Sequence, residues 1–345
     1  MTQDAALRLA LQELARGASL SEEATASAFG VLMRGEATPA QIAALLMGLR
    51  AKGETAAEIA GAASALRSAM IRVVTDEPDL LVDTCGTGGG RVGTLNISTA
   101  AAFIVAGAGV PVAKHGNRSY TSRSGSADVL EALGVNIALA PERAGDVLRQ
   151  ARIVFLFAPT YHPAMRHVGP VRKELGVATI MNLLGPLANP AGARRQVIGV
   201  SEEARAPLLA QALARLGAVH ALVLHAAVGM DEVSPSGTTA VWEVRDGAVR
   251  YLEVDPVAHG LGCDDLDQLA GGEPAENARR IEAILEGKGR PAERCAVLLN
   301  AGAALYVSGR RWTLEEAFAR AGDALDTGAA AEALARLRSA SASTS

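Results

Sequence analysis

The sequence predicts an α/β protein in which a small helical domain, residues 1–75, precedes a large domain, residues 76–345, built on a mostly parallel sheet flanked by helices. Three observations support this prediction. The 345 residues suffice for one large domain and one small one. Hydrophobic residues make up 49% of the chain but aromatic ones only 3%, which favours close-packed helices over an all-β fold. From about residue 78, short apolar segments alternate with helical ones.

The N-terminal domain shows only helical signals. Ser19 with Glu22 and Thr55 with Glu58 have the spacing of capping boxes. Nothing in this region suggests phosphate chemistry. Its apolar faces are therefore expected to pack against one another or against a partner subunit, and the sequence leaves both possibilities open.

The larger domain is expected to alternate strands and helices. Short apolar strands separated by helices indicate a parallel sheet covered on both faces, and ligands of such sheets bind at the carboxyl ends of the strands. The expected strands are Leu80–Asp83, Val110–Ala113, Arg152–Phe157, Gln196–Val200 and His220–His225, and the expected helices cover about 98–108, 126–133, 141–150 and 203–216.

The remaining segments depart from this alternation. Residues 162–189 carry three prolines, with a helix expected near Val171–Leu175. Apolar runs on either side of Asp246-Gly247 predict an antiparallel hairpin. Further helices are expected at 275–287, 291–308 and 313–338, and the serine-rich end from Ser339 is expected to fray.

Composition excludes several classes of protein. The formal net charge is −4 with both signs interleaved, so no basic stripe suggests a nucleic-acid footprint. The three cysteines, Cys85, Cys263 and Cys295, are few, odd in number and widely separated, which suits reduced thiols in a cytoplasm. No signal peptide is recognised, and the apolar run from Ala100 to Val110 is too short to span a bilayer. We expect a soluble cytoplasmic protein.

A glycine-rich loop follows the first expected strand. The strand runs into Gly86, Thr87 and then Gly88 to Gly90, and a helix is expected from Ser98, with Ser98 or Thr99 as its N-cap. Glycine N–H groups and a helix N-terminus favour an anion. Alone, the loop fits a plain strand-to-helix connection equally well. It matches neither the dinucleotide fingerprint, because Arg91 replaces the third glycine, nor the Walker pattern.

A second loop strengthens the signal. Lys114, His115, Gly116, Asn117 and Arg118 follow the Val110–Ala113 strand, which should bring them to the same sheet edge. Lys and Arg would supply countercharge for a phosphorylated ligand. The alternative is a solvated basic loop.

These motifs, in their order, resemble the anthranilate phosphoribosyltransferases. The matching segments are GTGGG (86–90), NIST (96–99), VAKHGNR (112–118), SGSADVLEALGV (124–135), YHPAM (161–165), VRKELGVATIMNLLGPLANPA (171–191) and Asp231-Glu232. The resemblance implies the nucleoside phosphorylase and phosphoribosyltransferase type of fold, with a segment at about 165–190 returning to the helical domain. It also implies a homodimer, Mg²⁺, and transfer of the phosphoribosyl group of 5-phosphoribosyl-1-pyrophosphate to the amine of anthranilate, a step of tryptophan synthesis.

The resemblance also implies the site residues. Asn117 and Arg172 would contact anthranilate, and Ser98, Asp231 and Glu232 would bind Mg²⁺. No side chain is expected to act as a chemical catalyst, because an arylamine is unprotonated near neutral pH and the reaction depends on positioning and charge stabilisation. The full set of expected substrate contacts is Gly86, Gly89, Gly90, Thr94, Asn96, Ile97, Ser98, Thr99, Lys114, His115, Gly116, Asn117, Arg118, Ser119, Tyr120, Thr121, Ser122, Ser126 and Arg172.

Plain alternatives accompany these assignments. Asp231 and Glu232 could be a solvated acidic pair, and Arg172 could form a surface ion pair in its mixed-charge helix. His115 and His162 are expected to shape the pocket, and this chemistry does not require a histidine. The competing functions are a pyrimidine nucleoside phosphorylase of the same fold and a non-catalytic nucleic-acid-binding relative.

One position departs from the family pattern. The first loop of the family usually ends in Asp, where this chain has Gly90. The change removes a carboxylate near the expected pyrophosphate site. It would either alter metal dependence and affinity for the sugar donor or impair the enzyme more severely; we favour the first outcome, since the other motif residues remain.

Overall fold

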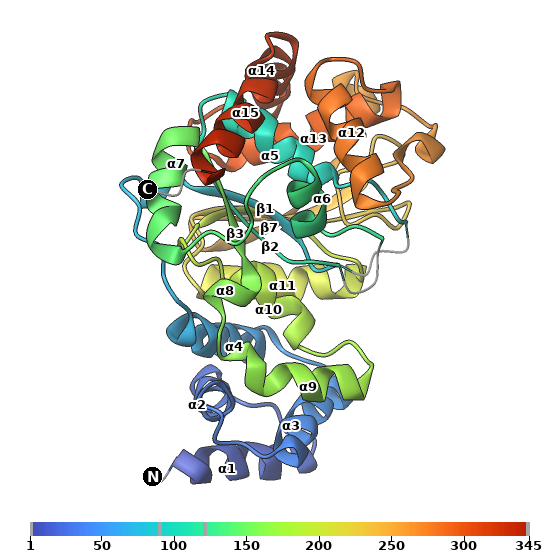
Figure 1. The fold of residues 1–345 in the computed structure, drawn as a ribbon. Coiled ribbons are helices and arrows are strands. Elements are labelled where there is room, and N and C mark those ends of the chain that lie inside the picture. Colours follow the sequence, from blue (N-terminus) through green and yellow to red (C-terminus); the bar gives the residue numbers. More distant parts are fainter. Residues whose placement is uncertain (1–2, 89–91, 120–122, 343–345) are drawn as a thin grey trace.

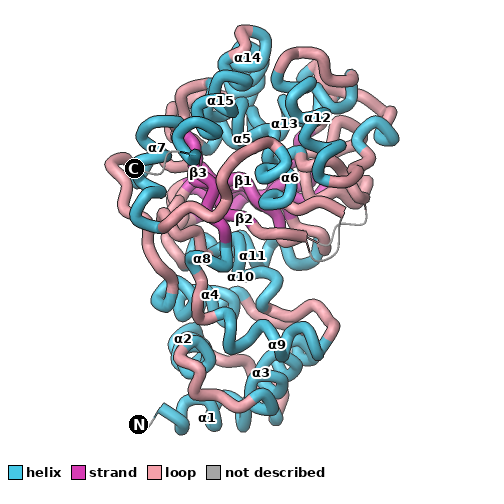
Figure 2. The backbone as a smooth tube through the Cα atoms, in the orientation of Figure 1, coloured by secondary structure: helices cyan, strands magenta, loops and turns pink. Residues whose placement is uncertain are grey.

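A computed structural model describes residues 3–88, 92–119 and 123–342. A helical bundle lies at one end of the molecule and a sheet sandwiched between helices at the other (Figures 1 and 2). The bundle begins with α1 (Gln3–Ala15), α2 (Glu22–Met33), α3 (Pro39–Lys52) and α4 (Ala56–Ala69). The fold class predicted from the sequence is confirmed.

The sheet has seven strands in the order β3-β2-β1-β4-β5-β6-β7. The first five of these strands are parallel to one another, β6 is antiparallel to β5, and β6 and β7 form an antiparallel hairpin at the edge. The strands are β1 (Val82–Gly86), β2 (Val112–Gly116), β3 (Ile153–Phe157), β4 (Arg195–Gly199), β5 (His220–Ala226), β6 (Thr239–Arg245) and β7 (Ala248–Val254).

Helices cover both faces of the sheet (Figure 1). One face carries α5 (Ile97–Gly107), α6 (Ser126–Ala132), α7 (Ala144–Ala151), α12 (Pro274–Leu285), α13 (Pro291–Val307), α14 (Leu314–Asp326) and α15 (Ala329–Ala342). Toward the bundle lie α8 (Ala158–Tyr161), α9 (Met165–Leu175), α10 (Met181–Leu187) and α11 (Ala206–Arg215). None of the helices in the described part of the chain combines the length and hydropathy needed to cross a bilayer.

The sheet divides the apolar interior into two cores. Along β5, Leu222 and Leu224 belong to the core under α5 and α13, whereas Ala221 and Val223 belong to the core shared with the helical bundle. This follows from the strand period of two, which sends successive side chains to opposite faces. Because α4 packs on α11, the bundle is joined to the sheet by apolar contact and not only by its connecting chain.

Several local predictions are confirmed. Thr55 caps α4 in a capping box with Glu58, as expected. Asp246 and Gly247, both with positive φ, form the tight turn between β6 and β7. A helix covers Val171–Leu175, although it begins earlier, at Met165.

Two N-cap predictions are wrong. Ser21, not Ser19, caps α2 by accepting a hydrogen bond from Ala24 N, and Ser19 instead receives a hydrogen bond from the Lys52 ammonium. Helix α5 begins at Ile97 after Asn96, so neither Ser98 nor Thr99 is the N-cap; both lie inside the first turn.

The helical stretch expected at 313–338 is confirmed, with a break at Thr327 and Gly328 that divides it into α14 and α15. The expected fraying of the C-terminal end is wrong. The chain does not fray from Ser339, since α15 continues to Ala342 and Ser341 is buried and accepts a hydrogen bond from Asn136 N.

Candidate active site

The carboxyl ends of neighbouring strands form the floor of the candidate site. Gly86 at the end of β1 is paired with Gly199 at the end of β4. The loop that carries Asp231 presses directly onto this edge, because a Cβ on Gly199 would lie 1.6 Å from the Asp231 carbonyl oxygen. A Cβ on Gly86 would lie 3.0 Å from Asp231 Oδ2. Residue 199 must therefore be glycine, and Asp231 is held against the strand ends.

Ser98, in the first turn of α5, connects several elements of the site. Its backbone N–H donates to Glu232 Oε1 at 3.2 Å, and its carbonyl accepts from the Thr84 hydroxyl at 3.1 Å. Its own hydroxyl oxygen accepts from Lys114 Nζ at 3.3 Å. The helix N-terminus thus brings together a hydroxyl, an ammonium and a carboxylate, the groups expected for a magnesium-bound diphosphate.

Lys114 is a buried cation with an exposed fraction of only 3%. Its ammonium donates to the Thr84 carbonyl at 2.5 Å as well as to Ser98. Within the described residues no carboxylate lies within 4 Å of it. Burial lowers the pKa of Lys114, against the opposing charges of Asp83 and Glu232. The Lys114 side chain therefore bonds only to uncharged groups among the described residues.

Asp231 and Glu232 lie in partly buried positions beside this cluster. Burial raises the pKa of both carboxyl groups, that of Glu232 to about 8, where the neighbouring Asp231 adds to the effect. A bound cation would relieve this cost, and two carboxylates with a hydroxyl are hard oxygen donors that suit Mg²⁺. Across residues 3–88, 92–119 and 123–342 no group of three or more His, Cys, Asp or Glu is arranged to hold a metal ion.

A buried polar network behind the second loop was not foreseen from the sequence. Asp83 Oδ1 accepts from His115 N at 3.1 Å, and Asp83 Oδ2 accepts from Asn189 Nδ2 at 2.8 Å. Asn189 also donates to the Ala113 carbonyl. These contacts join β1 and β2 to the segment that follows α10. Asp83 and Asn189 therefore position the end of β2, from which the second loop begins.

The two histidines of the motifs pack together. His115 Nδ1 lies 3.2 Å from the Gly185 carbonyl, which can only accept, so Nδ1 carries the proton. His162 Nε2, 3.2 Å from His115 Nε2, then donates to it. Burial lowers the pKa of His115 to about 3 and that of His162 to about 4. Both rings are neutral at pH 7 and connect the second loop to the segments around α8 and α10.

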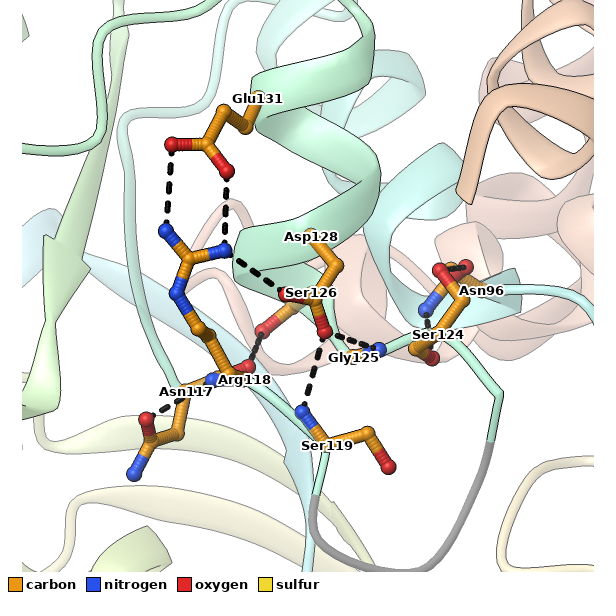
Figure 3. A network of polar contacts seen from close by, with 9 residues as sticks. All are labelled: Asn96, Asn117, Arg118, Ser119, Ser124, Gly125, Ser126, Asp128 and Glu131. Atoms are coloured by element: carbon orange, nitrogen blue, oxygen red, sulfur yellow. Dashed lines mark hydrogen bonds and ion pairs between the residues drawn. The ribbon is translucent and has the colours of Figure 1, made fainter. Parts of the chain in front are cut away.

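The described residues at the two ends of the second loop, Arg118, Ser119 and Gly125, bond to α6 (Figure 3). Arg118 donates from Nη1 to Asp128 and from both terminal nitrogens to Glu131 at 2.8–3.1 Å. Asp128 Oδ2 accepts from Ser119 N and Gly125 N, one on each side of the loop. The guanidinium thus lies over α6, and Asp128 brings the two ends of the loop together.

Asn96 links the two loops through its side chain (Figure 3). Its Nδ2 donates to the Ser124 carbonyl at 3.0 Å, and its Oδ1 accepts from the Ser124 hydroxyl and from Asn277 Nδ2. Ser126 Oγ donates to the Asn117 carbonyl at 3.3 Å. Asn96, Asn117 and Ser126, three of the predicted substrate contacts, therefore lie in one region of the molecule, whereas the part of α12 that carries Asn277 was not expected there.

The other predicted residues differ in position. Ile97 and Thr99 are buried in the first turn of α5, and Thr94 pairs with Ala270 in an isolated bridge outside the strands. Arg172 comes from the bundle side, in the last turn of α9, and is partly buried. The predicted contacts Gly89, Gly90, Tyr120, Thr121 and Ser122 lie outside the described residues.

Comparisons with known proteins identify the class of enzyme. Residues 78–331 match the description "Glycosyl transferase family, a/b domain" and residues 8–70 match "Glycosyl transferase family, helical bundle domain". The anthranilate phosphoribosyltransferase of Bradyrhizobium sp. strain ORS 278 is 51% identical over 331 residues, which cover 96% of this chain and 97% of that protein. That of Rubrobacter xylanophilus is 50% identical over 330 residues, 96% of each chain.

Solved structures agree. The anthranilate phosphoribosyltransferase of Thermus thermophilus superimposes with a TM-score of 0.90 at 42% identity, over 97% of this chain and 99% of that one. A Saccharomyces cerevisiae anthranilate phosphoribosyltransferase in complex with 5-phosphoribosyl-1-pyrophosphate and Mg superimposes with a TM-score of 0.88 at 28% identity, over 97% and 98% of the two chains. The chain is thus a glycosyltransferase. It belongs to the anthranilate phosphoribosyltransferases, and neither competing function gains support.

Proposed function

We propose that this chain transfers the phosphoribosyl group of 5-phosphoribosyl-1-pyrophosphate to the amine of anthranilate at the carboxyl ends of β1, β2 and β4. The products are N-(5-phosphoribosyl)anthranilate and pyrophosphate, in the second step of tryptophan synthesis from chorismate. The single observation that carries the assignment to this site is the meeting of Lys114 Nζ, the Ser98 hydroxyl and the Glu232 carboxylate at the N-terminus of α5. A diphosphate would find there a helix N-terminus, a cation without a contacting counterion and adjacent carboxylates for its metal.

The chemistry requires little from a base. The neutral arylamine attacks C1 of the ribose while the bond from C1 to the pyrophosphate oxygen breaks, and after the C–N bond has formed the acidic proton on nitrogen passes to solvent water. Positive charge develops on the sugar and negative charge on the leaving group, so the enzyme acts mainly by positioning and charge stabilisation. Lys114 would stabilise the departing pyrophosphate. The neutral His115 and His162 would shape the pocket without transferring a proton.

The metal assignment follows from the donor set. We propose that Asp231, Glu232 and the Ser98 hydroxyl hold Mg²⁺ together with phosphate oxygens of the substrate, the usual way in which this ion binds beside nucleotides. When bound, Mg²⁺ supplies charge neutralisation of the pyrophosphate. The S. cerevisiae enzyme crystallised with the sugar donor and Mg is consistent with this assignment.

The acceptor would be bound from the opposite side. We assign Asn117, at the start of the second loop, and Arg172, in the last turn of α9, to anthranilate, because a guanidinium can take its carboxylate in a bidentate manner. The two residues come from the sheet side and the bundle side of the molecule, respectively. An S. cerevisiae relative crystallised with 4-fluoroanthranilate supports an acceptor of this kind.

The test is an assay with the purified chain, anthranilate, 5-phosphoribosyl-1-pyrophosphate and Mg²⁺, followed by the loss of anthranilate fluorescence. Arg172→Ala is expected to raise the KM for anthranilate about tenfold or more, since it removes a charge-assisted hydrogen bond, with a much smaller effect on the KM for the sugar donor. Lys173→Ala, on the exposed side of the same helix, is the matched control. Absence of anthranilate consumption, or phosphorolysis of thymidine or uridine instead, would refute the proposal.

We also propose a division of the chain into two domains. The helical domain comprises residues 1–75 with the returning segment 165–190, and the α/β domain comprises residues 76–345. The packing of α9 on α2 and α3 supports this division.

We propose a homodimer formed through the helical domain, where Leu9 and Met47 are exposed apolar side chains. Light scattering in solution tests the dimer. A cytoplasmic location is supported by the free state of the cysteines.

A further inference from the structure

A cavity of about 820 Å³ lies at the opposite end of the sheet from the candidate active site. Its lining includes Arg195 and His220, the first residues of β4 and β5, and Arg245, the last residue of β6. The active-site cluster lies at the other ends of β4 and its parallel neighbours, beside Gly86 and Gly199. This volume is typical of small-molecule sites, which occupy about 300–1,000 Å³.

The cavity has an apolar interior. Strands β5, β6 and β7 provide one wall, and α13 and α14 provide the other. The wall side chains that carry no polar group include Leu222, Val241, Leu252, Val254, Leu314 and Phe318. An unfilled apolar space inside a protein forfeits dispersion contacts, so a ligand with an apolar body would be stabilised there.

Arg195 is held in place on the cavity wall. Its Nε donates to the Asp79 carbonyl at 2.8 Å and its Nη1 to the Val307 carbonyl at 3.0 Å. Gly309 packs against the guanidinium, because a Cβ there would lie 2.7 Å from Arg195 Nη2. In the described part of the chain no carboxylate lies within 4 Å of this group. Two backbone carbonyls thus fix the position of the charge without neutralising it.

Two further arginines stand at the exposed rim. Arg245 has only a loose carboxylate contact, 3.9 Å from its Nε to Asp246 Oδ2. Arg311 has no ion pair or hydrogen bond with another described residue. The Glu243 carboxylate near the wall already accepts from His220 Nε2 at 2.8 Å and from the Tyr306 hydroxyl at 2.9 Å. Three guanidiniums against Asp246 and Glu243 leave one net positive charge around the cavity.

We propose that this cavity is a second binding site, for an amphipathic organic monoanion whose apolar body fills the space between the sheet and α13–α14 and whose carboxylate or sulfonate meets Arg195, Arg245 and Arg311. The apolar lining and the single uncompensated charge select this class. A neutral hydrocarbon would leave the arginines without a partner, and a polyphosphate would make no favourable contact with the apolar walls.

The probe is 1-anilinonaphthalene-8-sulfonate, an aromatic monoanion that becomes fluorescent in apolar surroundings, compared with its neutral analogue N-phenyl-1-naphthylamine. The chain has two tryptophans, Trp242 and Trp312, and only Trp312 lines the cavity. In a Trp242→Phe variant, binding in the cavity is expected to give energy transfer from Trp312 to the probe. Saturable binding with a preference of about tenfold for the anionic probe is expected, from one charge-assisted contact.

Adjacent arginines supply a matched pair of variants. Arg311→Gln, at the rim, is expected to weaken binding of the anionic probe about threefold, and the double variant with Arg245→Gln about tenfold. Arg310→Gln, an exposed neighbour outside the lining, should leave the affinity unchanged. Ala303→Phe, which fills the interior, should abolish binding of both probes; the arginine variants test the proposal on their own if this variant does not fold.

Four results would overturn the proposal. The first is equal affinity for the anionic and neutral probes. The second is an equal effect of the Arg310→Gln and Arg311→Gln substitutions. Displacement of the probe by 5-phosphoribosyl-1-pyrophosphate would place it in the active site instead. Loss of probe binding as the protein concentration rises would show that a second copy of the chain covers the cavity.

Discussion

Lys114, in β2, and Arg118, in the loop that follows β2, are two cations with opposite surroundings. Lys114 is 3% exposed and bonds only to a carbonyl and a hydroxyl, with no carboxylate within 4 Å among the described residues. The Arg118 side chain is 46% exposed and pairs with both Asp128 and Glu131 (Figure 3). Burial lowers the pKa of Lys114, whereas the hydrogen bonds that Arg118 donates to Glu131 and Asp128 raise the pKa of Arg118.

The different surroundings of Lys114 and Arg118 indicate different roles, one in binding a ligand and the other in holding a loop. A buried charge without a contacting counterion interacts strongly with any anion that arrives, because the surroundings screen it little. An exposed guanidinium that already pairs with two carboxylates attracts a further anion only weakly. Such exposed ion pairs also contribute little to the stability of the fold. We therefore assign the electrostatic part of catalysis to Lys114 and the ordering of the second loop to Arg118 and Asp128.

The strongest test of this comparison is Lys114→Met. We expect kcat/KM for 5-phosphoribosyl-1-pyrophosphate to fall about 10²–10³-fold, the usual cost of removing one preorganised donor from a developing negative charge. Steady-state kinetics at saturating Mg²⁺ and anthranilate measures the change.

The control is a second lysine with little exposure. The Lys52 side chain is 11% exposed but contacts Glu58 at 3.0 Å, far from the sheet edge in the bundle. Lys52→Met should lower the melting temperature and leave kcat/KM within about twofold, because it breaks a structural pair. If both variants lose stability and activity in parallel, Lys114 has a structural role only.

The buried histidine pair next to Lys114 extends the comparison to pH. Unfolded histidine titrates near pH 6.5, whereas in the folded chain burial lowers the pKa of His115 to about 3 and that of His162 to about 4. Their stabilising contribution is complete above pH 6.5 and is lost as the pH falls toward the folded pKa values. Between pH 6.5 and 5 we expect the free energy of unfolding to drop by about 3 kcal/mol from these two groups, measured by urea denaturation.

Substitution of one histidine of the pair tests whether these two residues cause the loss of stability at acidic pH. His162→Gln retains an amide donor for His115 but removes one titrating group, so about half of the pH dependence should disappear. His167→Gln, in α9, leaves the pair intact and should retain all of it. An unchanged slope in His162→Gln would assign the acid sensitivity to other groups.

The smallest effects are expected at the exposed end of the loop. Arg118→Gln should raise the KM for the sugar donor about threefold, by loosening the loop, and the effect should shrink at high salt because exposed ion pairs are screened. Asp128→Asn should have a larger effect than Glu131→Gln, because Asp128 also accepts from Ser119 N and Gly125 N. A loss with Arg118→Gln as large as that with Lys114→Met would contradict the division of roles.

Much of the fold could be predicted because hydrophobic periodicity and turn residues are local signals. The strands expected at 152–157, 196–200 and 220–225 match β3, β4 and β5 to within one residue, but the ends of the first two strands could not be placed in this way. The expected Leu80–Asp83 and Val110–Ala113 strands are in fact Val82–Gly86 and Val112–Gly116. The hydrogen-bonded pairing of these strands continues through polar residues that have partners inside the protein. A prediction based on hydrophobicity alone ends the strands before these residues.

The same limit explains the functional residues that were missed. Asp83 and Thr84 lie in the polar extension of β1, and their partners His115 and Lys114 lie in the extension of β2. A polar pair directly after an apolar run is the signal that could have identified them. Asn189 and Asn277 lie far away in the sequence, and no local pattern connects them to the site.

The wrong helix starts have a related cause. Ser98 has the right chemistry for an N-cap, but the structure uses its backbone N–H for Glu232 and its hydroxyl for Lys114. Asn96 takes the N-cap position, but its side chain hydrogen-bonds to Ser124 and Asn277 and not to the backbone of the helix. Residues recruited by a site depart from local preference, and a single sequence does not mark which ones are recruited.

Because Gly199 has no side chain, its position offers a way to displace the proposed magnesium ligands while every charged side chain remains. Any larger residue there would push the Asp231 carbonyl away from β4, since even a methyl group has no room. A Gly199→Ala enzyme would keep its carboxylates, its lysine and its net charge, yet they would no longer face one another.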